Sequence, residues 1–217
     1  MRTLVIAGGP NINPCVASIA ASCDKVLCAD SGADFAVING IHIDRVIGDM
    51  DSISRDATDF LDMKNVPIEV YPPEKDMTDT ELVLRSIEKE SEVVLACSLT
   101  GRIDHVMANL NLILKLHEEG YDITATDGIT DVIPMCGKET ISLKGVDNPK
   151  TAVISLVLNR GDVNGVTTEG LYYKLDRADL KFGSSFSISN KLMPDTDSFS
   201  VTVEKGSMLV VITDSEA

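Results

Sequence analysis

Two carboxylates separated by a single residue, Asp49 and Asp51, form the most chemically suggestive feature of the sequence. They lie in Gly-Asp-Met-Asp-Ser, residues 48–52, directly after an apolar run. In an extended backbone alternate side chains point the same way, so the two Cα atoms would lie about 7 Å apart and both carboxylates could reach one cation. Mg²⁺ prefers oxygen ligands and usually combines one or two protein carboxylates with phosphate. An acidic turn is the alternative, because Gly-Asp and Asp-Ser are common in turns.

A second acidic group, with Asp76, Asp79 and Glu81, precedes a segment of helical periodicity. Thr78 and Glu81 have the spacing of a helix-capping box, and carboxylates in a first turn complement the helix dipole. Capping therefore accounts for part of this group. The group also follows a predicted strand, and ligands of open α/β sheets bind at the carboxyl ends of the strands. Both interpretations stay open at this point.

A cationic group follows a later strand in Thr-Gly-Arg-Ile-Asp-His, residues 100–105. Arg102 offers a planar fork suited to phosphate, Gly101 permits close backbone approach to an anion, and a helix N-terminus would follow. Asp104 could instead be the helix N-cap, and His105 an ordinary first-turn residue. A Mg²⁺–polyphosphate complex needs both signs of charge, so acidic and cationic groups at one sheet edge favour phosphoryl-type transfer. Gly8-Gly9 and Asp30-Ser31-Gly32 also follow predicted strands and could join the same edge.

The elements that would position these groups alternate between short apolar runs and helical segments. Strands are predicted at residues 3–7, 25–29, 45–47, 68–71, 92–97 and 121–126. Helices are predicted at residues 13–22, 32–39, 78–90 and 105–119. This alternation indicates an α/β domain over residues 1–136, with a Rossmann-like, mostly parallel sheet and helices on both faces.

The pattern changes near Gly137, after which short β runs are separated by turn residues. Strands are predicted at residues 140–143, 152–158, 171–174, 186–189, 199–203 and 208–212. Glycines separate them and no convincing helical pattern remains. We therefore expect a second, all-β domain over residues 137–217, built as a sandwich or jelly roll, with the boundary between Met135 and Lys138.

Composition excludes several other classes of function. The 217 residues carry 34 acidic against 19 basic side chains, a net charge of −15, which disfavours binding to nucleic acid or to an anionic membrane surface. Five cysteines without a Cys-x-x-Cys pair are typical of reduced thiols in a cytoplasmic protein. The N-terminal apolar stretch, residues 4–7, is too short for a signal peptide or a membrane span.

Taken in order, the motifs resemble those of the thiamine pyrophosphokinase (thiamine diphosphokinase) family, over nearly the whole chain. They are residues 29–33, 48–52, 73–81 and 100–105 with Asn109, followed in the β domain by residues 170–175 and Ser189-Asn190. The chain departs from the family pattern at Ser31 and Thr100, where many members have glycine. It also has Tyr173 where some relatives have Trp, which would reduce the stacking surface.

The resemblance implies the reaction ATP + thiamine → AMP + thiamine diphosphate, in a homodimer whose active sites lie at the subunit interface. It implies Mg²⁺ among Asp49, Asp51 and Asp79, with Asp30 and Asp76 nearby. The first three with Arg102 and Asp104 form the expected catalytic set. The residues expected on the nucleotide and phosphate side are Asp30, Asp76, Thr78, Gly101, Arg102, His105 and Asn109. The residues expected to contact thiamine, partly from the partner subunit, are Tyr173, Ser189 and Asn190.

Positioning and charge stabilisation account for the expected chemistry, in which the thiamine hydroxyl attacks the β-phosphorus in line without a covalent enzyme intermediate. A carboxylate such as Asp49 or Asp104 could accept the hydroxyl proton. Two alternatives remain from the residues themselves: a Mg²⁺-dependent hydrolase of nucleotides or phosphate esters, and a non-catalytic thiamine- or nucleotide-binding module. The sequence leaves the general base, the number of metal ions and the nucleotide preference undecided.

Overall fold

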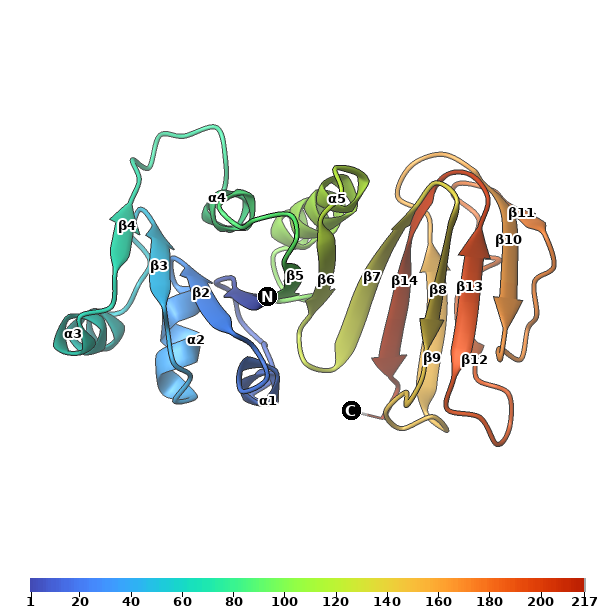
Figure 1. Ribbon diagram of the computed structural model, residues 1–217, viewed down its shortest axis with the longest axis horizontal. Coiled ribbons are helices and arrows are strands. Elements are labelled where there is room, and N and C mark those ends of the chain that lie inside the picture. The colour runs from blue at the N-terminus through green and yellow to red at the C-terminus, as the bar shows by residue number, and fades with distance from the viewer. Residues whose placement is uncertain (217) are drawn as a thin grey trace. The chain divides into compact units, whose positions relative to one another are not determined.

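A computed structural model describes residues 1–216 and divides by backbone contacts into two units. The first unit comprises residues 1–112 and 119–128, and the second comprises residues 113–118 and those from 129 onward. Most elements of both are labelled in Figure 1. No helix among residues 1–216 has the length and apolar character needed to cross a membrane.

The first unit is built on a six-stranded sheet in which every neighbouring pair is parallel, with the order β6-β5-β1-β2-β3-β4. The strands are β1 (Arg2–Ile6), β2 (Lys25–Ala29), β3 (Arg45–Gly48), β4 (Ile68–Val70), β5 (Glu92–Ala96) and β6 (Asp122–Thr126). Each corresponds to a strand predicted from an apolar run. The α/β class and the mostly parallel sheet are therefore confirmed.

The helices of this unit are α1 (Val16–Ala20), α2 (Gly32–Ile38), α3 (Arg55–Lys64), α4 (Asp79–Arg85) and α5 (Ile103–Glu118), of which residues 113–118 group with the second unit. Helices α1 and α4 are shorter than predicted. Helix α3 was not predicted, because its buried residues are Ala57 and Leu61 and such sparse burial leaves little apolar periodicity. Local signals define its ends: the Ser54 hydroxyl accepts a hydrogen bond from Ala57 N, and Asn65 adopts a left-handed conformation (φ 53°).

Burial on both faces explains why the central strands read as uninterrupted apolar runs. On one face, Leu4 and Ile6 of β1 pack in a cluster with Ala33 and Ala36 of α2. Helix α4 lies on the opposite face in Figure 1 and contributes the buried Val83. The same strands therefore anchor helices on both sides and fix where their carboxyl ends lie.

The second unit is antiparallel and contains two four-stranded arrangements, β12-β9-β14-β7 and β11-β10-β13-β8. Its strands are β7 (Thr130–Cys136), β8 (Glu139–Leu143), β9 (Ala152–Val157), β10 (Val163–Glu169), β11 (Ala178–Leu180), β12 (Asn190–Lys191), β13 (Phe199–Val203) and β14 (Ser207–Asp214). Buried and partly exposed residues alternate along β9 and β13, as expected for strands with one core-facing side. The antiparallel β character of this region is confirmed, whereas the jelly-roll and Rossmann-like descriptions stay predictions.

Two predicted strands of this unit are wrong. Residues 171–174 form an isolated bridge at Leu171 followed by bends, and residues 186–189 form turns. Their aromatic and β-branched residues suggested strands, but those side chains are largely exposed in loops. Conversely, β10 was missed because its polar threonines and Gly165 conceal the apolar alternation.

Strand β7 was also not predicted, and it bears on the domain boundary. It pairs antiparallel with β14 over its whole length. The contacts therefore group residues from 129 onward with the second unit, while the functional boundary after Cys136 stays a prediction.

Replacement of Gly32 by alanine should destabilise the first unit. A Cβ atom at this position would lie 2.1 Å from the Ile6 carbonyl oxygen, so the helix or strand must move. We expect a loss of about 3 kcal/mol, the upper end of the usual cost of overpacking because the clash is with a backbone atom, measured by urea unfolding. Gly40→Ala is the matched control, because Gly40 has a positive φ of 65° but open space around its Cβ position, so its cost should be about 1 kcal/mol. Equal losses in the two variants would contradict the close approach of β1 and α2.

Candidate active site

A pocket in the first unit lies at the carboxyl ends of the parallel strands. Loops after β1, β2, β3 and β5 contribute to it, together with the N-terminal residues of α4 and one side of α5. Its lining residues are Gly8, Gly9, Pro10, Asp30, Ser31, Ser52, Thr78, Asp79, Thr80, Ser98, Thr100, Arg102, His105, Val106 and Asn109. Hydroxyl groups, one guanidinium and two carboxylates therefore face the same space, as a polyphosphate ligand requires.

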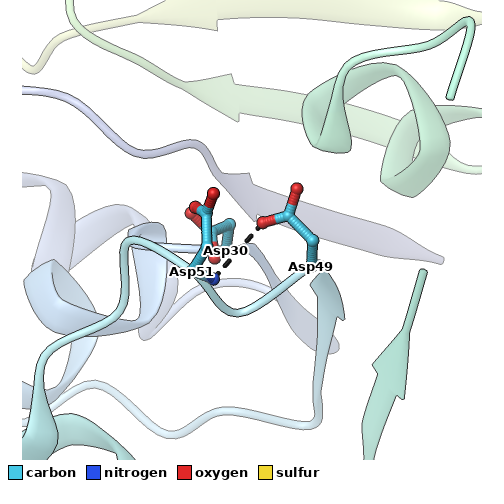
Figure 2. A group of neighbouring side chains, drawn as sticks. All are labelled: Asp30, Asp49 and Asp51. Carbon is cyan, nitrogen blue, oxygen red and sulfur yellow. Dashed lines mark hydrogen bonds between the residues drawn. The ribbon is translucent and has the colours of Figure 1, made fainter. Parts of the chain in front are cut away.

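Three carboxylates gather beside this pocket at Asp30, Asp49 and Asp51 (Figure 2). One oxygen from each lies within 4.8 Å of the others. The loop is not extended, as the sequence interpretation assumed, because Met50 adopts a left-handed conformation with φ 65°. Asp51 N donates to Asp49 Oδ1 at 3.3 Å, so the chain turns and brings the two carboxylates together by curvature rather than by strand alternation.

Asp30 is the most buried of the three, with 8% of its surface exposed. Ser52 Oγ donates a hydrogen bond to Asp30 Oδ2. Within residues 1–216, Asp30 Oδ1 is buried without a hydrogen-bond partner, a costly arrangement for a carboxylate in the absence of a cation. Gly48 permits this approach, since a Cβ there would lie 2.9 Å from the Asp30 Cβ. The donor set and the unpartnered oxygen fit a hard divalent cation.

Asp79, expected in the metal site, lies outside this group of three and connects to it through Lys75. The Lys75 ammonium is 3.0 Å from Asp49 Oδ2 and 3.2 Å from Asp79 Oδ1. The hydrogen bond from Lys75 is the main reason that the pKa of Asp49 is lowered. For Asp79, burial outweighs the same hydrogen bond, and Asp49 and Asp30 add repulsion, so its pKa is raised. The sequence interpretation did not single out Lys75, because no local pattern pairs it with a carboxylate 26 residues earlier.

Thr78 caps α4 and also lines the pocket. Its hydroxyl accepts a hydrogen bond from Glu81 N at 3.2 Å, which confirms the predicted N-cap. The reciprocal half of the capping box is replaced, because the Glu81 carboxylate accepts from Arg85 Nε at 2.7 Å. Asp79, Thr78 and Thr80 reach the pocket from this helix end, whereas Asp76 precedes the helix and is not among the lining residues.

Arg102 and Asp104 form an exposed pair at the start of α5. Arg102 donates to both carboxylate oxygens of Asp104, at 3.2 and 2.6 Å, which lowers the pKa of Asp104 and raises that of Arg102. Asp104 is not the N-cap, because α5 already begins at Ile103. Gly101 has a φ of 84°, a conformation suited to glycine, just before the helix. His105 and Asn109, one turn apart on α5, both line the pocket.

The residues expected to contact thiamine lie in the second unit, and Tyr173 and Asn190 line one pocket there. Its lining residues are Leu156, Tyr172, Tyr173, Lys174, Leu175, Phe186, Ser187, Ile188 and Asn190. The Asn190 amide accepts from Tyr173 N at 3.0 Å and donates to Tyr173 O at 2.8 Å, so it holds the tyrosine backbone. Ser189 is not among the lining residues, and its N–H donates to Ser155 Oγ.

Sequence reasoning missed several residues of these pockets. Ser98 and Thr80 line the first pocket, and they could have been found because Thr80 lies within the motif of residues 73–81 and Ser98 just before that of residues 100–105. Tyr172 packs edge-on against Tyr173, with ring centroids 5.1 Å apart, and Lys191 lies 4.4 Å above its ring. Tyr172 was predicted to be part of a strand, which concealed its place on this surface.

Comparison with known families covers both units. The protein-family model described as "Thiamin pyrophosphokinase, catalytic domain" matches residues 16–125 of the sequence. The model described as "Thiamin pyrophosphokinase, vitamin B1 binding domain" matches residues 140–208. Together they include every predicted site residue.

Individual relatives agree with these matches. The chain is 27% identical to thiamine pyrophosphokinase of Bacillus subtilis over 215 residues, covering 97% of this chain and 98% of the relative. It is 25% identical to thiamine pyrophosphokinase 2 of Arabidopsis thaliana, covering 85% of this chain and 75% of the relative.

Solved structures share the fold. The crystal structure of the Bacillus subtilis thiamine pyrophosphokinase matches with a TM-score of 0.85 at 23% identity, covering 99% of this chain and 100% of the other. That of the Geobacillus thermodenitrificans protein, titled thiamin pyrophosphokinase, matches with a TM-score of 0.84 at 22% identity, covering 100% and 99%.

Asp30→Asn should stabilise the metal-free protein and abolish its response to divalent cations. The change removes one of three neighbouring negative charges and leaves an amide that can still accept from Ser52. A gain near 1 kcal/mol corresponds to a rise in Tm of about 2–4 °C for a chain of this length, measured by calorimetry without metal. Mg²⁺ added in sufficient excess to saturate weak binding of the free cation should raise the Tm of the unchanged protein but not that of the variant. Asp59→Asn, which removes an exposed charge on α3, is the control. A variant that is strongly destabilised without metal would contradict this assignment.

Proposed function

The chain belongs to the thiamin pyrophosphokinase family, and we propose that Asp30, Asp49 and Asp51 hold the Mg²⁺ used as it transfers the pyrophosphoryl group of ATP to thiamine. Membership of this family supports the reaction and identifies ATP and thiamine as its substrates. The proposal for the metal rests on one observation, the buried and unpartnered Asp30 Oδ1 inside a group of three carboxylates. Oxygen ligands of this kind favour Mg²⁺ over softer metals.

The reaction forms one bond and breaks one. The oxygen of the thiamine hydroxyethyl group bonds to the β-phosphorus, the bond from that phosphorus to the oxygen bridging the α-phosphorus breaks, and AMP leaves. The proton of the hydroxyl passes to a base, for which Asp49 and Asp104 are candidates. A bound Mg²⁺ would neutralise charge that develops on the phosphate oxygens.

Residues of the pocket in the first unit would bind the nucleotide and its phosphates. Arg102 can leave Asp104 for the polyphosphate, because both side chains are exposed and the exchange replaces one anionic partner by another. Lining hydroxyls and the free N–H groups at the start of α5 can donate to phosphate oxygens. On the nucleotide and phosphate side we place Asp30, Asp76, Thr78, Gly101, Arg102, His105 and Asn109, with Asp79 among the catalytic residues.

Thiamine would be bound by the second unit through Tyr173, Ser189 and Asn190. In this proposal Tyr173 provides the stacking face, since its side chain is 62% exposed, and Asn190 fixes its backbone. Ser189, in a left-handed conformation, would supply a backbone or hydroxyl contact. Residues 1–136 would thus form the catalytic domain and residues 137–217 the thiamine-binding and dimerisation domain, consistent with family matches that end and begin on either side of that boundary.

We further propose a homodimer and a cytoplasmic location. The chain has four Tyr and five Phe, and the second unit exposes four of these side chains within a short stretch, at Tyr172, Tyr173, Phe182 and Phe186. Exposed aromatics in such number favour an interface. All five cysteines are free thiols, which suits a reducing compartment.

Replacing Asp49 by asparagine should reduce kcat/KM at least about 10- to 100-fold, since the variant loses a charged metal ligand. The assay follows AMP and thiamine diphosphate in the presence of ATP, Mg²⁺ and thiamine. Asp59→Asn should keep the activity of the unchanged protein. Formation of AMP at the same rate without thiamine would instead support the hydrolase alternative, and absence of both products would support a binding module.

A further inference from the structure

The Lys75 ammonium lies between the carboxylates of Asp49 and Asp79. It is 3.0 Å from Asp49 Oδ2, 3.2 Å from Asp79 Oδ1 and 3.3 Å from the Pro72 carbonyl oxygen. The ammonium donates hydrogen bonds to Asp49 and to the Pro72 carbonyl, and its contact with Asp79 is an ion pair. The Lys75 side chain is 13% exposed and that of Asp49 is 12% exposed, so solvent screens the interaction only in part.

The contact joins the acidic group of three to the N-terminus of α4. Asp49 belongs to the group formed with Asp30 and Asp51, whereas Asp79 is the first residue of α4. Both oxygens of Asp49 are already engaged, Oδ1 by the N–H of Asp51 and Oδ2 by Lys75. A divalent cation that enters the group must therefore share Asp49 with an ammonium or displace it.

A divalent cation could enter the site either free or bound to a polyphosphate, and the charge of Lys75 affects these two cases differently. A free divalent cation would share the Asp49 carboxylate with the Lys75 ammonium, and the two positive charges would repel each other. A cation that arrives on a polyphosphate brings negative oxygens with it, and the flexible lysine stem allows the ammonium to exchange Asp49 for one of them. Thr78 and Asp79, three and four residues after Lys75, line the pocket, and the ammonium is in contact with Asp79 at its edge.

We propose that Lys75 makes the site selective for a metal–nucleotide complex over the free divalent cation, by occupying Asp49 and Asp79 until a polyphosphate accepts its ammonium. Lys75 is thus a positioning and specificity-determining residue that holds the carboxylates together in the metal-free protein. This inference rests on the proposed function, since it assumes that Asp30, Asp49 and Asp51 hold the metal.

The test compares two ligands by isothermal titration calorimetry. One is Mg²⁺ without nucleotide, and the other is Mg²⁺ with the α,β-methylene analogue of ATP, whose bond at the transfer position cannot be cleaved. The variant is Lys75→Met, which keeps the length of the side chain and removes its charge. Lys89→Met is the matched control, because Lys89 contacts the Glu119 carbonyl oxygen and the Tyr121 ring rather than the acidic group.

Lys75→Met should bind Mg²⁺ without nucleotide about 10-fold more tightly than the unchanged protein, since relief of like-charge contact is worth at least that factor. Its affinity for the Mg²⁺–analogue complex should be unchanged or lower, and Lys89→Met should match the unchanged protein for both ligands. If Lys75→Met does not fold by circular dichroism, Lys75→Gln replaces it, because its amide can still donate to Asp49.

Three results would overturn the proposal: free Mg²⁺ binding to the Lys75 variant no tighter than to the Lys89 control, no detectable Mg²⁺ binding to the Lys75 variant, or an equal gain for both ligands. Failure of the unchanged protein to bind the Mg²⁺–analogue complex is a different result. It would overturn the proposed metal site itself, and the role of Lys75 with it.

Discussion

Mutual repulsion among carboxylates is the constraint on which the rest of this site depends. Asp30, Asp49 and Asp51 bring three carboxylates together, with one oxygen of each within 4.8 Å of the others, and Asp79 adds a fourth through Lys75. The chain is already strongly acidic, with a net charge of −15, so its overall field does nothing to relieve them. The cluster persists because local partners offset its cost: the Ser52 hydroxyl, the backbone N–H of Asp51 and the ammonium of Lys75.

The parallel sheet supplies the geometry in which these partners can meet. Every strand of the first unit points the same way, so the loops after β1, β2, β3 and β5 emerge along one edge. Two glycines let the elements approach closely enough: Gly32 beside the Ile6 carbonyl, and Gly48 beside Asp30. The apolar core shared by β1 and α2 then supports the strained and charged loops above it. Asp30 and Met50 can adopt left-handed conformations there because the neighbouring strands hold the backbone on either side in place.

The second unit combines an apolar core with an exposed aromatic surface. Its core is formed by alternating residues of β9, β13 and neighbouring strands. The loops between strands hold Tyr172 and Tyr173 outward, and the Asn190 amide fixes the backbone of Tyr173 with two hydrogen bonds. Lys191 lies over the Tyr172 ring and places a charge beside this apolar surface. An exposed aromatic face with a polar border suits the recognition of a heteroaromatic cation.

The sequence by itself determined the features that short-range patterns encode: the six parallel strands, the Thr78 cap, and the acidic and cationic motifs that follow the strands. Prediction from the sequence failed where a contact joins residues far apart in the chain, or where the apolar periodicity of a segment is weak. Helix α3 has few buried residues, the polar alternation of β10 hides its inner face, and the aromatic residues near 172 and 186 suggested strands that are loops. Only the tertiary structure decided that Met50 turns the Asp49–Asp51 loop and that Asp30 joins the cluster. It also placed Lys75 between Asp49 and Asp79. The physical reason is that residue types and spacing describe what a segment can do, whereas pairing across 26 residues or more depends on which strands lie side by side.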